Sequence, residues 1–195
     1  MDIQHLPLFP LHTVLFPGGP LPLRIFEPRY LEMVSRCLRT DTGFGVALIR
    51  HGREVGEVAL THEVGTVARI VDWHQRHDGL LGVSSRGEAR FRILSTEVQP
   101  NQLTVARVEL WPEAAHLALP NRHLPLADLL RRLLDQAGHL YADVPRRFGD
   151  ADWVGCRLSE LLPLENGRKQ ALLEMDDPLE RLERLLALLS GLELG

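Results

Sequence analysis

Proline is the residue that most constrains how this 195-residue chain can begin to fold. Five prolines stand close together, at positions 7, 10, 17, 20 and 22. Each lacks an amide donor and fixes its own φ near about −65°, so this stretch cannot form a continuous helix. Two short apolar runs, residues 14–16 and 21–26, are therefore predicted to be strands that pair around the turn at residues 17–20.

A helix is predicted directly after this extended stretch. Pro28 suits the first turn of a helix, where its missing amide costs nothing. One face of the helix would be apolar, because five apolar residues recur at helical spacing: Tyr30, Leu31, Val34, Cys37 and Leu38.

The hydrophobic pattern changes once along the rest of the chain. Up to residue 111, short alternating or apolar runs predict strands over 43–49, 64–73, 80–85, 88–94 and 103–111. After Pro112 the apolar spacing becomes three to four, which predicts helices over 126–140, 153–162, 168–175 and 177–189. Asp152 and Asp177 are the expected N-caps of two of these helices. We therefore expect an α+β protein with a β lobe over 1–118 and an α-helical lobe over 119–195, divided near Ala114 to Pro120.

The composition is that of an ordinary folded protein, with 45% hydrophobic and 25% charged residues and a net charge of −4. The chain lacks the excess of basic residues that duplex nucleic acid would require, because contacts to the phosphates supply most of the affinity of duplex-binding proteins. No apolar stretch reaches the roughly 18–20 residues of a membrane span, and the first residues lack the basic start of a signal peptide. We expect a cytoplasmic protein in which Cys37 and Cys156 are buried thiols.

Three segments of the β region carry a family resemblance: the proline-rich start, Val64 to Ile70 and Gly87 to Ile93. The resemblance continues through the helical region, over residues 161–164, 169–174 and 177–189. Together they resemble the Lon N-terminal domain family, the substrate-binding domain found in front of the ATPase of Lon proteases and also as a free-standing bacterial protein.

The resemblance implies a PUA-like β pseudobarrel followed by an α-helical bundle lobe. It also implies a non-catalytic module that binds unfolded polypeptide or a partner protein, with a separate protease as a further candidate partner. We expect no enzyme activity from these 195 residues. Lys169, the single lysine, lies between Arg168 and Gln170 in a helical pattern and cannot complete a P-loop.

Phe26, Glu27, Arg29 and Tyr30, at the predicted junction between strand and helix, are the candidate binding residues. The two aromatic side chains are of the type that anchors binding surfaces. The opposed charges beside exposed backbone could hold peptide main chain or chain termini. The alternative is that Glu27 and Arg29 pair with each other or with the second lobe.

Two histidines and two carboxylates fall within seven residues, as Asp72, His74, His77 and Asp78. Such groups can bind zinc or iron. We favour a solvated hairpin tip instead, because no second ligand cluster is identifiable elsewhere in the sequence. We therefore expect no metal and no cofactor.

RNA binding is the alternative function, since PUA-like barrels often bind RNA. Arg86, Arg90 and Arg92 could contact phosphates from one predicted strand region. The balanced charge of the β region disfavours this alternative. A third hypothesis, an unrecognised hydrolase, rests on scattered histidines alone.

Overall fold

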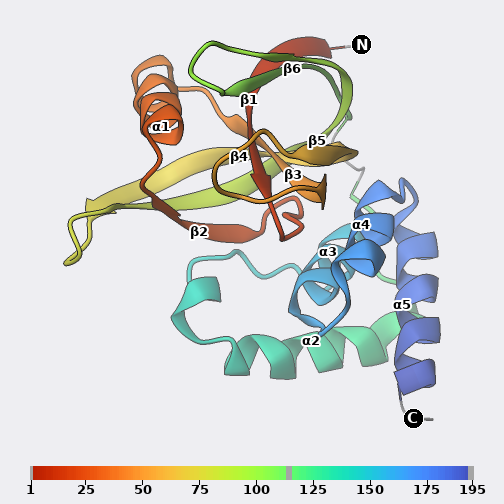
Figure 1. Cartoon of the computed structure of the whole chain (residues 1–195). Coiled ribbons are helices and arrows are strands. Elements are labelled where there is room, and N and C mark those ends of the chain that lie inside the picture. Colours follow the sequence, from red (N-terminus) through yellow and green to blue (C-terminus); the bar gives the residue numbers. More distant parts are fainter. Residues whose placement is uncertain (1, 113–115, 193–195) are drawn as a thin grey trace. The chain divides into compact units, whose positions relative to one another are not determined.

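The computed structural model describes residues 2–112 and 116–192. The chain divides into two compact units, Met1–Pro112 and Glu113–Gly195. Strands dominate the first unit and helices the second, so the predicted α+β class is confirmed (Figure 1). The predicted boundary begins at Ala114, which lies outside the described residues, and its position stays a prediction. No helix among the described residues combines the length and apolar character that a membrane crossing requires.

The first unit contains six strands and one helix within its described part. The strands are β1 (Asp2–Leu11), β2 (Pro20–Ile25), β3 (Phe44–His51), β4 (Leu60–Gln75), β5 (Leu81–Val98) and β6 (Thr104–Leu110). Five of them close a ring in the order β1, β3, β4, β5, β6, because β6 pairs with both β5 and β1. Only β1 and β3 run parallel. Strand β2 lies outside the ring and pairs with the first half of β5.

The predicted hairpin between residues 14–16 and 21–26 is wrong. Residues 14–16 form no strand, and β2 pairs with β5, about sixty residues further along the chain. Residues 14–16 are buried in irregular structure instead, where the Thr66 hydroxyl donates to the Leu15 carbonyl at 2.6 Å. The Phe16 carbonyl approaches Gly87 so closely that any Cβ there would overlap it. Strand β5 runs unbroken through Gly87, where two separate strands were predicted.

Helix α1 (Pro28–Thr40) begins at the predicted proline. Tyr30, Val34 and Cys37 are buried on its apolar face, as predicted. Leu31 and Leu38 are 38% and 42% exposed, and the unpredicted Met33 is buried at 1%. The buried face is thus rotated slightly from the predicted one, and it packs against the first-unit core.

The second unit consists of short helical segments. They are η1 (Asn121–His123), α2 (Leu124–Gln136), η2 (Gly138–Tyr141), α3 (Ala151–Leu161), α4 (Asn166–Glu174) and α5 (Pro178–Leu192). Helix α2 ends four residues before the predicted Leu140, and a 3₁₀ turn follows it. Asp177 accepts from the Leu179 amide at 2.8 Å, as an N-cap of α5 should.

The predicted cap of α3 is wrong by two residues. Asp150, rather than Asp152, accepts the amide hydrogens of Asp152 and Trp153 at 3.0 and 3.4 Å. The Asp152 carboxylate instead lies 2.6 Å from Nη1 of Arg181 on α5. Both residues are aspartates two positions apart, so residue type alone could not separate their roles.

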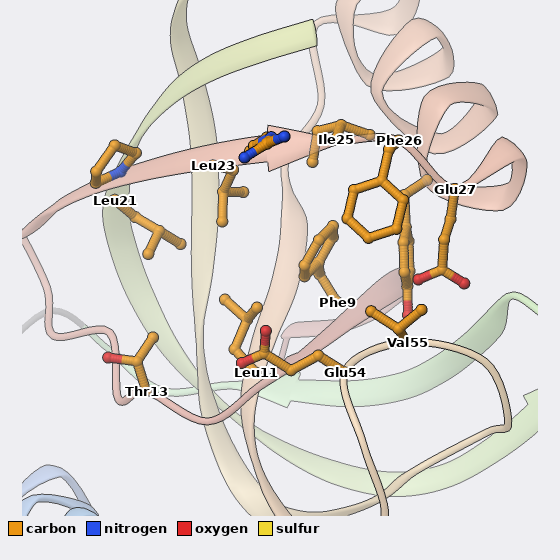
Figure 2. A pocket seen from close by; sticks show the side chains of 13 residues that line it. Phe9, Leu11, Thr13, Leu21, Leu23, Ile25, Phe26, Glu27, Glu54 and Val55 are labelled. Carbon is orange, nitrogen blue, oxygen red and sulfur yellow. The ribbon is translucent and has the colours of Figure 1, made fainter. Parts of the chain in front are cut away.

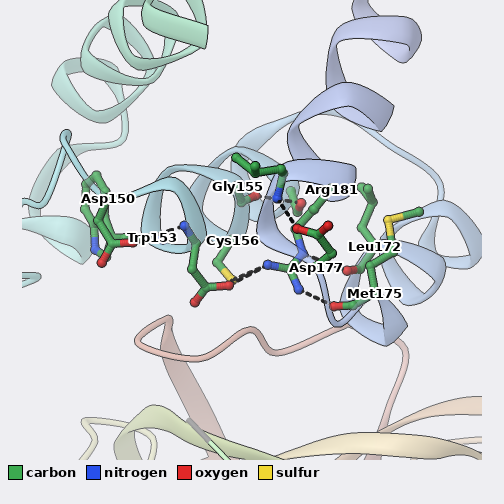
Figure 3. A network of polar contacts seen from close by, with 11 residues as sticks. Asp150, Trp153, Gly155, Cys156, Leu172, Met175, Asp177 and Arg181 are labelled. Atoms are coloured by element: carbon green, nitrogen blue, oxygen red, sulfur yellow. Dashed lines mark hydrogen bonds and ion pairs between the residues drawn. The ribbon is translucent and has the colours of Figure 1, made fainter. Parts of the chain in front are cut away.

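Arg181 is almost fully buried, at 1% exposure, and joins three helices of the second unit. Its Nε donates to the Leu172 carbonyl at 2.9 Å, and its Nη2 donates to the Met175 carbonyl (Figure 3). Those carbonyls stand at the end of α4, where helical carbonyls lack an intrahelical partner. Cys156 lies beside this arginine, and burial raises the pKa of its thiol to about 12. Cys37 is likewise a buried free thiol, as predicted.

Leu182 offers a direct test of how α5 packs. Its side chain is fully buried, whereas Leu186, one turn further on, is only half-buried. We expect Leu182→Ala to lower the free energy of unfolding by about 3 kcal/mol, as truncation of a buried leucine does. Leu186→Ala is expected to cost less than half of that. Urea denaturation followed by circular dichroism measures both, and equal losses would contradict the observed orientation of α5.

Candidate functional site

A cavity of about 360 Å³ lies in the first unit, beside β2 (Figure 2). It is lined by Phe9, Leu11, Thr13, Leu21, Pro22, Leu23, Arg24, Ile25, Phe26, Glu27, Tyr30, Glu54 and Val55. We call this cavity the β2 pocket. Most of its lining is apolar, with two carboxylates and one guanidinium among the charged side chains.

Strands β2 and β1 and helix α1 build much of the wall of the β2 pocket. Consecutive residues 21–25 of β2 line it, as expected for a pocket that runs along the edge of a strand rather than over one face. Phe9 and Leu11 come from the end of β1, where the pairing with β6 has stopped. The first turn of α1 contributes Tyr30, whose ring centroid lies 4.2 Å from that of Phe9.

The open edge of β2 is short of hydrogen-bond donors. The Gly87 amide donates to the Gly19 carbonyl, so by alternation Leu21 and Leu23 bond to β5. Pro20 and Pro22 then face the other edge, and neither has an amide hydrogen to offer. Among the described residues, β2 has β5 as its single strand partner. This edge therefore exposes carbonyl groups with few amides between them.

The structure brings three of the four predicted binding residues into the pocket lining: Phe26, Glu27 and Tyr30. Phe26 is 49% exposed, whereas Tyr30 is buried at 5%. Burial raises the pKa of the Tyr30 phenol; the Arg29 charge lowers it, and the carboxylates of Glu27 and Glu54 raise it further. The phenol therefore remains a neutral hydrogen-bond donor at physiological pH.

Arg29 does not line the pocket and is buried at 7% exposure. Its Nη2 lies 2.9 Å from Oε2 of Glu27, and its Nη1 donates to the Gln102 carbonyl at 3.1 Å. Its guanidinium also stacks 4.7 Å from the centre of the Tyr30 ring. Glu27 and Arg29 thus pair with each other, and Arg29 orients two lining residues. Direct binding by the predicted residues stays a prediction.

Sequence reasoning missed Glu54 and Val55, which reach the pocket from the loop between β3 and β4. Glu54 accepts the His12 amide at 2.6 Å, and Glu27 accepts the Gly56 amide at 3.4 Å. The loop turns at Gly52 and Gly56, which have φ of +111° and +93°. The two glycines are a signal from which a loop could have been predicted, but nothing in the sequence indicates which part of the barrel that loop approaches.

The cluster that was expected to be a solvated hairpin tip lies at the end of the β4–β5 hairpin, with Asp72 and His74 in β4 and His77 and Asp78 in the turn. Asp78 accepts the Leu80 amide at 3.1 Å and pairs with Arg24 and Arg76 at 3.3 and 3.4 Å. His74 and His77 are exposed. Within residues 2–112 and 116–192, no three histidine, cysteine or acidic side chains are grouped as metal ligands.

The arginines of the RNA-binding alternative do not form one exposed row. Arg90 is buried at 8% exposure, with its guanidinium 4.5 Å from the Trp111 ring centre. Arg92 is exposed but also stacks on Trp111, at 5.3 Å. Arg86 is half-buried. These contacts give two of the three side chains a packing role beside Trp111.

Residues 5–191 match the family described as the ATP-dependent protease La (LON) substrate-binding domain. The chain belongs to this family. A Lon N-terminal domain protein from Xanthomonas campestris is 41% identical, with a TM-score of 0.80 over 94% of this chain and 98% of that one. The N-terminal domain of a Mycobacterium avium complex Lon protease is 20% identical, with a TM-score of 0.66 over 94% and 97% of the two chains, and shows the shared fold.

Two curated relatives of this Lon substrate-binding domain are much longer proteins. Lon protease 2 of Myxococcus xanthus is 29% identical over 199 residues, which cover 96% of this chain and 24% of that protein. Protein cereblon of Xenopus tropicalis is 32% identical over 137 residues, which cover 67% of this chain and 29% of that protein. The chain thus spans about a quarter of the length of these relatives.

Proposed function

We propose that this domain is a non-catalytic module that binds unfolded polypeptide, or an extended segment of a partner protein, through the β2 pocket. The observation that carries the proposal is the exposed apolar mouth of this pocket. Phe26 and Val55 are 49% and 51% exposed, although the walls behind them, such as Ile25 and Phe9, are buried. Apolar surface left open around a concave site is typical of binding. Membership of the Lon substrate-binding family supports the same role.

The binding mode that fits this pocket is capture of side chains. Addition of a peptide strand to β2 would leave several peptide carbonyls without donors, because Pro20 and Pro22 offer no amide hydrogen. The cavity of about 360 Å³ is near the lower end of ligand pockets and suits one or two large side chains. Burial of one such side chain contributes about 1.5–3 kcal/mol. Affinity at this single site should therefore be weak and tolerant of sequence.

The absence of catalysis is part of this proposal. The single lysine, Lys169, donates from Nζ to the Glu160 carbonyl at 2.7 Å, and burial lowers its pKa while the Glu160 charge raises it. This contact joins α4 to α3 and gives Lys169 a structural role. We further propose a bacterial, cytoplasmic setting in which a separate protease is one partner that could receive the bound chain.

Phe26→Ala tests the proposal without removing a core residue. We expect it to weaken binding of a reduced, carboxymethylated and fluorescently labelled polypeptide at least fivefold, because Phe26 is the most exposed aromatic at the pocket mouth. Fluorescence anisotropy measures the affinity. Leu60→Ala is the matched control, since Leu60 is 67% exposed and lies outside the pocket lining.

A titration with labelled single-stranded RNA distinguishes RNA binding, the alternative function, from polypeptide binding. Phosphate-mediated RNA binding falls steeply between low and physiological salt, whereas capture of apolar side chains changes little. Tight, salt-sensitive RNA binding that survives Phe26→Ala would overturn the proposed function. So would polypeptide binding that Phe26→Ala and Leu60→Ala weaken equally.

A further inference from the structure

We propose that the β2 pocket selects polypeptide segments in which a bulky apolar residue is flanked by lysine or arginine. The inference rests on the proposed function and adds a charge preference to it. The apolar side chain would occupy the cavity, and the neighbouring cation would reach the carboxylate of Glu54 at the pocket mouth. Figure 2 shows the carboxylates of Glu54 and Glu27 on either side of Val55.

Each of the two carboxylates keeps one oxygen available. Oε1 of Glu54 accepts the His12 amide, and Oε2 of Glu27 accepts from Arg29 and from the Gly56 amide. Within the described part of the chain, the second oxygen of each has no hydrogen-bond or ion-pair partner. The charges of both carboxylates raise the pKa of the buried Tyr30 phenol, so both lie close enough to influence the same part of the pocket. The pocket mouth is therefore supplied with acceptors that a cationic donor would satisfy.

The other charges near the pocket do not cancel this preference. Arg24 also lines the pocket; it is 57% exposed and shares the Asp78 carboxylate with Arg76, at 3.3 and 3.4 Å. Arg29 is buried and neutralises Glu27 from behind. Glu54 has no ion-pair partner among the described residues, and its neighbours in the loop, Arg53 and Glu57, are exposed with opposite signs. Of the two lining carboxylates, Glu54 is therefore the one that no cation neutralises among the described residues.

The exposed apolar lip also suits a cationic neighbour. Lysine and arginine lay their aliphatic stems on apolar surface while the charged end stays in water. The ring of Phe26 and the methyl groups of Val55 provide such a surface at the pocket mouth, and Val55 adjoins Glu54 in the loop (Figure 2). A cation over the Phe26 ring gains a further attraction from the aromatic face. One ion pair near solvent contributes modestly, so the expected preference is about threefold rather than a strict requirement.

Three synthetic peptides test the preference. They share one central phenylalanine in a Gly/Ser background and differ only in the two flanking residues, which are lysine, glutamine or glutamate. We expect the lysine peptide to bind about threefold more tightly than the glutamine peptide, and the glutamate peptide to bind most weakly. Glu54→Gln should abolish the difference between lysine and glutamine peptides. Glu57→Gln, which removes the same charge from the same loop, should keep the difference.

The outcomes separate this inference from the function on which it rests. Equal binding of all three peptides, lost in Phe26→Ala, would overturn the charge preference and keep the polypeptide-binding function. Failure of all three to bind at peptide concentrations in the millimolar range would overturn both. A lysine preference reduced equally by Glu54→Gln and Glu57→Gln would overturn the assignment to Glu54, because it would reflect only the net charge of −4. Higher salt should weaken the lysine peptide selectively.

Discussion

Arg181→Met is expected to lower the free energy of unfolding of the helical unit by about 4 kcal/mol, within the range of about 3–5 kcal/mol for breaking a buried ion pair. The side chain is 1% exposed and serves the carbonyls of Leu172 and Met175 as well as Asp152. Asp152 is 24% exposed, so water can partly solvate the charge left behind. Most of the loss should therefore come from the two carbonyls, since a buried polar group without a partner costs about 1–3 kcal/mol.

Arg184→Met is the matched control, because it makes the same chemical change at an exposed position of the same helix. We expect it to change stability by no more than about 0.5 kcal/mol, as surface substitutions do. Urea denaturation followed by circular dichroism at 222 nm compares the two variants. Equal midpoints for Arg181→Met and the parent would show that the carbonyls at the end of α4 find other donors.

Gly65→Ala should be as damaging to the barrel as the loss of Arg181 is to the helices, costing about 4 kcal/mol or preventing folding. An added Cβ would meet the Val46 carbonyl of the paired strand and the ring of Phe91, both closer than real Cβ contacts allow. Phe91 is fully buried, so its ring has no open space to move into. The carbonyl belongs to the sheet and cannot move without disturbing the pairing of β3 with β4.

Gly167→Ala provides the comparison for this substitution. Gly167 lies in α4, and a Cβ there meets nothing within 4 Å. Alanine is the better helix former, so we expect a gain of up to about 1 kcal/mol. Thermal unfolding and soluble yield measure both variants. If Gly65→Ala melts at the temperature of the parent, the barrel interior is less tightly packed at this position than the structure shows.

The helices and strands whose signals are local in the sequence could be predicted from it. Pro28 and Asp177 marked the beginnings of α1 and α5, and the change of hydrophobic period after Pro112 separated strands from helices. These signals are local, because capping and periodicity depend on residues within a few positions of one another. The family resemblance then supplied the arrangement of the strands, which the periodicity could not.

The failures share a physical cause, which is that alternation identifies a strand but not its partner. The run at residues 14–16 has strand character, yet its backbone bonds elsewhere, with Leu15 accepting from Thr66. Three of the four predicted pocket residues come together in the structure because they are close in sequence. Glu54 could not be foreseen, because its place in the pocket lining depends on where the loop between β3 and β4 runs.

The donor-poor edge of β2 has a consequence for the polypeptide binding that we propose. Captured segments of such chains readily form cross-β assemblies when they meet a strand edge that can act as a template. Pro20 and Pro22 deprive this edge of the amide hydrogens that a template needs. If the domain binds unfolded chains as proposed, the same prolines that block a helix at the start of the chain would keep its open strand from templating the growth of captured segments into fibrils.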